Sequence, residues 1–196
     1  MSLTRIAVVG AGTMGNGIAH VAAQYGKHVV LVDVSAVVLE GARATISKNL
    51  DRQLKKGVLD AAAKDATLSR IELSTDLASA VASVQIVIEA VPEKADLKYA
   101  VVDAVDAAAG PATIIATNTS SISITEIAAR TGRPDRVVGM HFMNPVPVMQ
   151  LVEVIRGLAT SDDTTHAVLA LTQDMGKTPV EVNDFPGFVS NRVLLP

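Results

Sequence analysis

A histidine and a glutamate stand twelve residues apart in an otherwise uncharged segment, GMHFMNPVPVMQLVEVI, residues 139–155. Apart from His141 and Glu153, this segment has the composition of a buried sheet. Two explanations are open. His141 is either a core histidine whose ring bonds a backbone carbonyl, or one half of an acid–base unit that moves protons.

A glycine-rich turn near the N-terminus offers a second kind of chemistry. The residues VVGAGTMG have the spacing G-x-G-x-x-G after a short apolar run. Such glycines permit a tight turn, a close approach of pyrophosphate to the backbone, and close packing of the next helix on the strand. The helix N-terminus then presents free N–H groups to phosphate. The turn therefore predicts dinucleotide contacts at Gly10, Gly12, Thr13, Met14 and Gly15.

Asp33 follows the second apolar run, 23 residues after Gly10. An acidic residue at about this distance bonds the ribose hydroxyls of a dinucleotide and repels a 2′-phosphate, which favours NAD over NADP. The following residues, DVSAVV, contain no arginine that would accommodate the extra phosphate. The alternative is an ordinary turn aspartate or a cap for the next helix.

Alternating strands and helices would position these residues. Apolar runs predict strands at 5–9, 28–33, 71–75, 85–91, 113–118, 136–142, 150–155 and 178–183. Helical patterns occur at 13–26, 35–57, 76–82, 93–109, 125–131 and 161–176. This alternation is typical of an α/β fold of the Rossmann type, with a doubly wound and mainly parallel sheet.

In such a fold His141 would lie at the carboxyl edge of the sheet, where a bound nicotinamide lies. Hydride transfer from an alcohol needs a base for the hydroxyl proton. If the strand that carries Glu153 is a neighbour, FMNPVPVM would form the turn between the two strands. Glu153 would then fix the tautomer of His141 and stabilise the imidazolium that proton transfer creates.

The composition excludes several other classes of protein. The chain has 196 residues, with 49% hydrophobic and 19% charged, as expected for a folded protein. Its net charge of −3 and its lack of a basic block argue against nucleic-acid binding. Without a signal peptide or a membrane-length apolar run, we expect a cytoplasmic protein or a processed organellar one. The absence of cysteine excludes disulfides and thiolate metal sites, and no metal is predicted.

Longer motifs indicate a family. The chain resembles the NAD-binding domain of the L-3-hydroxyacyl-CoA dehydrogenases, from GAGTMGNGIA through TNTSSISIT and HFMNPVPVMQLVEVI to DFPGFVSNR. This resemblance covers essentially the whole chain. It implies NAD-dependent oxidation of an (S)-3-hydroxyacyl-CoA to the 3-oxoacyl-CoA, with a short-chain substrate such as 3-hydroxybutyryl-CoA.

The resemblance also implies residue roles. His141 would be the catalytic base and Glu153 its partner, with Ser120 near the substrate oxygen and the nicotinamide, and Asn191 near the substrate carbonyl. Further cofactor contacts would be Glu93, Lys98, Ser120 and Asn144. Contacts with CoA would be Asn49, Lys56, Lys98 and Ser120, although the family often has serine where Asn49 stands.

Simpler structural explanations remain open for several of these residues. Ser120 and Asn144 have the types expected in turns. Glu93 would suit the first turn of a helix through the helix dipole. Lys56 belongs to KNLDRQLKK, which has the composition of a solvated helix face, and Asn191 could be a plain helix residue.

The same resemblance predicts the domain organisation. Residues 1–185 would form the Rossmann domain, and residues 186–196 would begin the connection to an all-helical C-terminal domain that is missing from this chain. In the family that domain supplies most of the dimer interface and closes the cleft. We therefore expect a homodimer for the full-length protein, and NADH binding with weak turnover for this chain alone.

Two other functions stay open. The same fold serves a gulonate-type sugar-acid dehydrogenase, which would not use acetoacetyl-CoA. The chain could also be a cofactor-binding protein with little catalytic activity. A mere binder would need only the glycine turn and the acid after the second strand, so His141, Glu153, Ser120 and Asn191 favour an enzyme.

Overall fold

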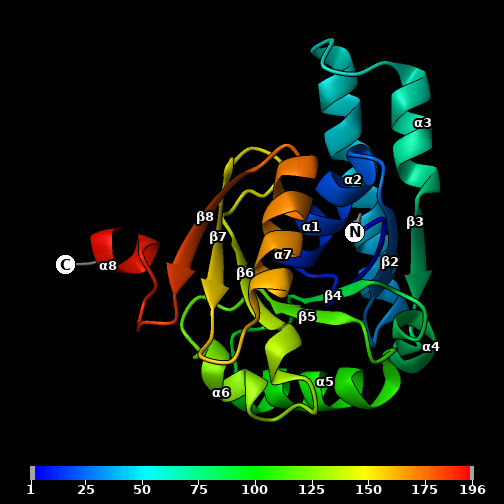
Figure 1. The fold of residues 1–196 in the computed structure, drawn as a ribbon. Coiled ribbons are helices and arrows are strands. Elements are labelled where there is room, and N and C mark those ends of the chain that lie inside the picture. The colour runs from blue at the N-terminus through cyan, green and yellow to red at the C-terminus, as the bar shows by residue number, and fades with distance from the viewer. Residues whose placement is uncertain (1–2, 195–196) are drawn as a thin grey trace.

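A sheet of eight strands runs through the computed structural model, which describes residues 3–194 (Figure 1). The strands are β1 (Arg5–Val9), β2 (His28–Val32), β3 (Ile71–Ser74), β4 (Ile86–Glu89), β5 (Ile114–Thr117), β6 (Val137–Phe142), β7 (Leu151–Arg156) and β8 (Thr178–Asn183). Their order across the sheet is β3-β2-β1-β4-β5-β6-β7-β8. Every neighbouring pair is parallel except β6 and β7. The predicted Rossmann-type, mainly parallel sheet is confirmed.

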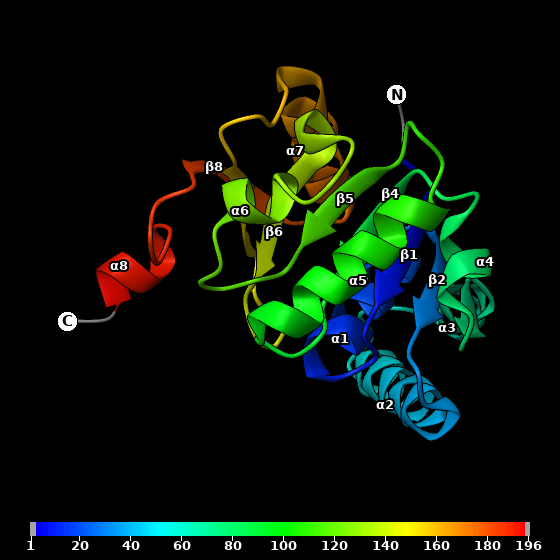
Figure 2. The ribbon, with the colours of Figure 1, turned by 90° about the horizontal axis from the view of Figure 1, so that it is seen from below.

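Helices cover both faces of this sheet (Figures 1 and 2). They are α1 (Thr13–Gln24), α2 (Ala36–Lys55), α3 (Ala61–Ser69), α4 (Leu77–Val81), α5 (Ala95–Ala108), α6 (Ile124–Ala128), α7 (Asp162–Asp174) and α8 (Ser190–Leu194), with a 3₁₀ helix η1 (Pro134–Arg136). One apolar core joins the sheet to α1, α2 and α7, and a second joins it to α4, α5 and α6.

The central strands are apolar on both faces because helices bury both faces. In β1, Ile6 and Val8 belong to the first core, whereas Ala7 and Val9 belong to the second. Each Ile or Val that is fully buried contributes roughly 1.5–3 kcal/mol of transfer free energy. β8, at the edge of the sheet, is exposed at four of its six positions. The continuous apolar runs therefore mark the central strands.

One helix between β2 and β3 was not predicted. Residues 61–69 form α3, and the Asp60 side chain caps it by accepting a hydrogen bond from the Ala63 N–H at 2.7 Å. Lys64 of α3 forms an ion pair with Asp51 of α2, and the two helices extend together beyond the sheet (Figure 1). The sequence signal was available, because an aspartate before a run of alanines is a helix start.

α8 follows β8 and stands apart from the other helices (Figure 1). This short helix lies in the predicted connecting segment, residues 186–196. Residues 1, 2, 195 and 196 of the two predicted domains lie outside the described range. The division at residue 185 stays a prediction. Within residues 3–194, none of the helices combines the length and the hydropathy that crossing a bilayer requires.

Candidate active site

The turn between β1 and α1 depends on two of its three glycines. Gly10 has a φ of +99°, and a Cβ atom there would lie 2.8 Å from the Ala90 carbonyl oxygen. A Cβ atom on Gly15 would lie 1.6 Å from the Gly10 carbonyl oxygen. Gly12 differs, because a Cβ atom there would meet nothing within 4 Å. Gly10 and Gly15 thus build the turn, and Gly12 leaves open space above it.

A cavity of about 600 Å³ opens over this turn. Its wall comes from the carboxyl ends of β1 and β2, the segment that follows β4, and the loop that follows β5. The predicted cofactor residues that line the cavity are Gly10, Gly12, Thr13, Met14, Asp33, Glu93 and Ser120. A cavity of this size at the carboxyl edge of a parallel sheet suits a dinucleotide.

The first turn of α1 faces this cavity through Thr13 and Met14. Gly12 is the N-cap residue, and within residues 3–194 this helix start has no side-chain cap for its first N–H groups. These free donors and the positive end of the helix dipole favour an anion there. The residues present therefore fit the pyrophosphate of a dinucleotide.

Asp33 joins two segments at the edge of the cavity. Its Oδ2 accepts a hydrogen bond from the Ala11 N–H at 2.9 Å, and its Oδ1 accepts one from the Ser35 N–H at 3.1 Å. Asp33 therefore has the structural role in a turn that its residue type suggested. A carboxylate can accept about four hydrogen bonds, so this one keeps acceptor capacity for a ligand.

Three charged side chains meet behind the cavity. Lys98 is 1% exposed, and its Nζ donates to Glu89 Oε1 at 2.9 Å and to Glu89 Oε2 at 3.1 Å. Glu93 Oε2 lies 3.3 Å from the same Nζ. Lys98 thus lies beneath the cavity, and in this conformation its ammonium is engaged by protein oxygens. Sequence reasoning missed Glu89, although a carboxylate in the apolar run QIVIEAV was a signal.

Glu93 organises the loop that follows β5. Its Oε1 accepts hydrogen bonds from the Thr119 hydroxyl, the Ser120 N–H at 2.9 Å, and both the N–H and the hydroxyl of Ser121. Burial raises the pKa of Glu93, but these hydrogen bonds and the charge of Lys98 outweigh it and leave the pKa below its ordinary value. Glu93 precedes α5 rather than lying in its first turn, so the helix-dipole explanation does not apply.

Ser120, His141 and Glu153 form a continuous polar chain. Because β6 and β7 are antiparallel, His141 and Glu153 face each other across the strand pair. His141 Nδ1 lies 2.9 Å from Glu153 Oε2, and His141 Nε2 lies 3.1 Å from Ser120 Oγ. The structure therefore brings His141 and Glu153 together as the turn FMNPVPVM predicted, and it adds Ser120 at the other end.

The environment of Glu153 determines the tautomer of His141. Glu153 is 1% exposed, and its Oε1 accepts hydrogen bonds from the N–H groups of Val189 at 3.0 Å and Ser190 at 2.8 Å. Burial raises the pKa of Glu153, but the bonds from His141, Ser190 and Val189 together hold it below its ordinary value. An ionised Glu153 only accepts, so Nδ1 of His141 carries a proton and Nε2 of the neutral ring can take one.

Asn191 completes the predicted catalytic set. It lies in α8, and its Nδ2 donates to the Ser120 carbonyl oxygen at 2.9 Å. Phe188, which sequence reasoning did not single out, places its ring 5.9 Å from the His141 ring, at an interplanar angle of 58°. The four predicted catalytic residues therefore meet at one place, with a phenyl ring beside them.

The remaining predicted residues lie elsewhere. Asn144 is exposed in the loop between β6 and β7, outside the wall of the first cavity. Asn49 and Lys56 line a second cavity of about 620 Å³ between α1, α2 and the same loop. Lys177, also on its wall, is 8% exposed, and its Nζ donates to the carbonyl oxygens of Val146 at 2.6 Å and Met149 at 2.7 Å. The residues predicted to bind CoA therefore lie in two places. Asn49 and Lys56 line the second cavity, whereas Ser120 lines the first cavity and Lys98 lies buried behind it.

The glycine turn, the acid after β2 and the cavity between them define a dinucleotide-binding domain of the Rossmann type. The buried pair of His141 and Glu153 at the same edge of the sheet sets a histidine ring, hydrogen-bonded to a carboxylate, beside this domain's cofactor cavity.

The chain belongs to the family whose model is described as "3-hydroxyacyl-CoA dehydrogenase, NAD binding domain", which matches residues 5–185. NAD is therefore its cofactor. The probable 3-hydroxybutyryl-CoA dehydrogenase of Bacillus subtilis is 52% identical over 196 residues, all of this chain and 68% of that protein. The 3-hydroxyadipyl-CoA dehydrogenase of Escherichia coli is 44% identical, and the chain spans 41% of it.

A solved structure agrees with these sequence relatives. The crystal structure of (S)-3-hydroxybutyryl-CoA dehydrogenase from Ralstonia eutropha matches with a TM-score of 0.96 and 51% identity. The match covers 98% of this chain and 68% of that one. The chain therefore has the fold of the nucleotide-binding part of that enzyme and spans about two thirds of its length.

Proposed function

We propose that this chain carries the cofactor site and the proton-transfer group for the oxidation of a short-chain (S)-3-hydroxyacyl-CoA to the 3-oxoacyl-CoA. The observation that carries the proposal is the chain of hydrogen bonds from Ser120 through His141 to Glu153, next to a cavity over a glycine turn. Relatives named for 3-hydroxybutyryl-CoA support the substrate class.

NAD would be held along the first cavity. The free N–H groups at the start of α1 would face its pyrophosphate, and Asp33 would bond its adenosine ribose. When bound, NAD supplies the acceptor for the hydride that leaves C3 of the substrate. Glu93, Ser120 and Asn144 would supply further contacts with NAD.

His141 would take the proton of the substrate hydroxyl. Its Nε2 is the ring atom that faces Ser120, and the tautomer held by Glu153 leaves that atom able to accept a proton. As the imidazolium forms, Glu153 would stabilise its charge across the 2.9 Å contact at Nδ1. Ser120 and Asn191 would hold the substrate oxygens in place while the proton moves.

The CoA part of the substrate would lie along the second cavity. Asn49 and Arg52 of α2 line this cavity together with Lys56, the residue that caps the end of α2, and Lys177 adds a buried positive charge. Guanidinium and ammonium groups suit the phosphates of CoA. In the whole protein, we propose that residues 1–185 form the cofactor domain, that residues 186–196 lead to a helical domain, and that the subunits pair as homodimers.

The test of this function is an assay of NADH oxidation with acetoacetyl-CoA. We expect a saturable rate that exceeds the rate of the His141→Gln variant under the same conditions. Comparison reactions with NADPH and acetoacetyl-CoA, and with NAD and gulonate, should be much slower. A rate equal to that of the variant, with NADH still bound, would reject the proposed activity for this chain. Faster turnover of gulonate would assign the chain to the sugar-acid dehydrogenases.

Asp33→Asn should weaken NADH binding and reduce the preference for NADH over NADPH. The substitution removes the negative charge that accepts from ribose hydroxyls and repels a 2′-phosphate. A hydrogen bond to a charged group contributes about 1.5–3 kcal/mol, so the dissociation constant for NADH should rise about 10- to 100-fold. Fluorescence titration of both variants with both cofactors measures this change. An unchanged NADH to NADPH affinity ratio would remove Asp33 from cofactor selection.

A further inference from the structure

The segment that follows β8 returns to the polar chain instead of leaving the domain directly. It is anchored at its start, because Asp184 Oδ2 accepts from the Ser123 hydroxyl at 2.7 Å and from the Thr125 N–H at 2.8 Å. Asp184 therefore ties the segment to the N-terminus of α6. From this anchor the chain returns to β7, where the N–H groups of Val189 and Ser190 bond Glu153, and Phe188 joins the second core.

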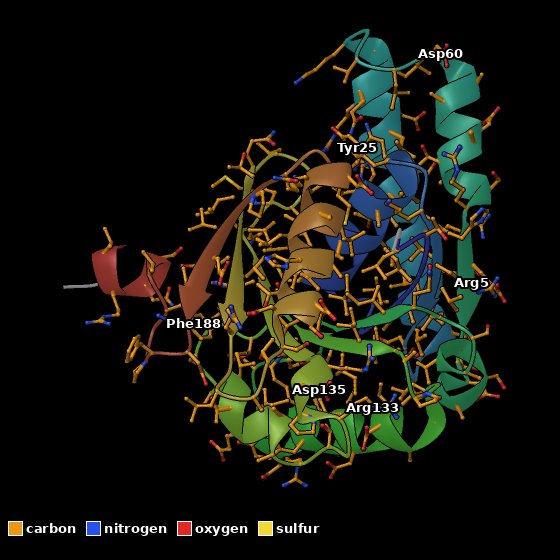
Figure 3. The ribbon with its side chains drawn as sticks, viewed as in Figure 1. Arg5, Tyr25, Asp60, Arg133, Asp135 and Phe188 are labelled. Atoms are coloured by element: carbon orange, nitrogen blue, oxygen red, sulfur yellow. The ribbon has the colours of Figure 1, made fainter. Side chains whose placement is uncertain are left out.

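Phe188 is the residue of this segment that is buried in the core. It is 3% exposed and belongs to the second core, and Figure 3 labels it in the segment that follows β8. Phe185, three residues earlier, is 58% exposed although it has the same side chain. The segment thus presents two phenylalanines, and one of them lies against His141 at 5.9 Å.

The backbone at Phe188 is in an unusual conformation. Its φ is +50°, in the left-handed region that residues with a side chain seldom adopt, and Gly187 before it has a φ of +77°. These two residues turn the chain sharply, so that the next two N–H groups, of Val189 and Ser190, both point at Glu153 Oε1. Strained backbone of this kind persists where surrounding contacts hold it, and it is common at functional sites.

This segment contacts each member of the polar chain. The Phe188 ring lies beside His141, the N–H groups of Val189 and Ser190 bond Glu153, and the Asn191 side chain bonds the carbonyl of Ser120. Each member also has contacts within the sheet or the β5 loop. The segment from Phe188 to Asn191 therefore contacts all three members of the polar chain.

We propose that residues 184–191 are part of the catalytic site as a positioning element, with Phe188 as its central positioning residue. The inference rests on the proposed function of His141. Phe188 fixes the backbone turn that bonds Glu153, and Glu153 in turn fixes the tautomer and the direction of the His141 ring. Any displacement of the chain after Phe188 is therefore transmitted to the base.

The test compares Phe188→Leu with Phe185→Leu, which makes the same substitution at the exposed position of the same segment. The first readout is the tautomer of His141 in the 196-residue chain, measured by long-range ¹H–¹⁵N NMR correlation. We expect the Nδ1–H form to predominate in the parent chain and in Phe185→Leu. In Phe188→Leu, we expect a mixture of the two tautomers.

Kinetics gives the second readout. Phe188→Leu should lower kcat for acetoacetyl-CoA reduction about 10- to 100-fold, as expected for a misplaced catalytic group, while NADH affinity stays unchanged. Gly187→Ala provides an independent disruption of the same turn, because φ at this position is +77° and a Cβ atom would lie 3.3 Å from Arg192 Cγ. It should change the tautomer in the same direction without altering a side chain next to His141.

These outcomes separate this inference from the proposed function. If Phe188→Leu and Gly187→Ala both fold and both keep the His141 tautomer of the parent chain, the positioning role is overturned, even if the chain is active. A changed tautomer supports the positioning role even if acetoacetyl-CoA is not the substrate. If Phe185→Leu changes the tautomer as much as Phe188→Leu, the effect belongs to general loosening of the segment and the assignment to Phe188 is overturned.

Discussion

His141→Gln should lower kcat for acyl-CoA turnover about 10²- to 10⁴-fold, the usual contribution of a general base. Glutamine has a similar reach and can bond Ser120 or Glu153, but it cannot take a proton at neutral pH. His141 does not line the cavity over the glycine turn, so NADH affinity should stay within about twofold, a difference of less than 1 kcal/mol. Steady-state kinetics and fluorescence titration of NADH measure the two effects separately.

The control for this substitution is His20→Gln. His20 is buried like His141, but burial lowers its pKa to about 4, and it lies in α1, away from the polar chain. If His141→Gln and His20→Gln reduce turnover equally, the loss reflects core packing rather than proton transfer. Loss of NADH binding together with turnover in His141→Gln would likewise indicate a role in folding.

Glu153→Gln should lower kcat by about 10²-fold or more, because the amide cannot satisfy all the donors around it. The carboxylate accepts from His141 on one oxygen and from the N–H groups of Val189 and Ser190 on the other. A glutamine has one acceptor oxygen, so its NH₂ group must face either a backbone N–H or the ring. In the second case the ring turns to the wrong tautomer, and Nε2 no longer accepts the substrate proton.

The same substitution should change how stability depends on pH. The pKa of Glu153 is lower in the folded chain than in the unfolded chain, where it is about 4.3. The ionised carboxylate therefore stabilises the folded chain. This stability is fully present above the unfolded pKa and is lost as the pH falls through the folded pKa. As the pH falls from about 5 to about 3, the free energy of unfolding should therefore decrease less for Glu153→Gln than for the parent chain. Urea unfolding at several pH values measures this difference. Parallel pH profiles for the two proteins would show that Glu153 has the same pKa in the folded and unfolded chains.

Much of the fold follows from local patterns. Ser35, which bonds the Val38 N–H, and Gly57, at a φ of +68°, bound the long second helix as expected from their residue types. The predicted strands match all eight strands of residues 3–194. The central ones are continuous apolar runs because strands covered by helices on both faces exclude polar side chains. The helix after Asp60 was missed, although its alanines and its cap are local signals too.

The polar network under the cavity could not be predicted in the same way. Glu89 bonds Lys98 and also Thr117, which lies 28 residues further along the chain on the neighbouring strand. This contact depends on β4 and β5 being adjacent and in register. A charge in an apolar strand indicates that a partner exists, but it does not identify the partner.

The sequence by itself predicted the nucleotide-binding turn, NAD as the cofactor and the residues proposed for catalysis, because glycine spacing and motif residues are properties of a short stretch of chain. Only the tertiary structure decided that Ser120, His141, Glu153 and Asn191 form one site. The bond from Asn191 to Ser120 spans 71 residues, and that from His141 to Glu153 requires antiparallel pairing in one particular register. A shift of one residue would turn Glu153 to the opposite face of the sheet, so the acid–base pair exists only because the packed cores hold the strands in place.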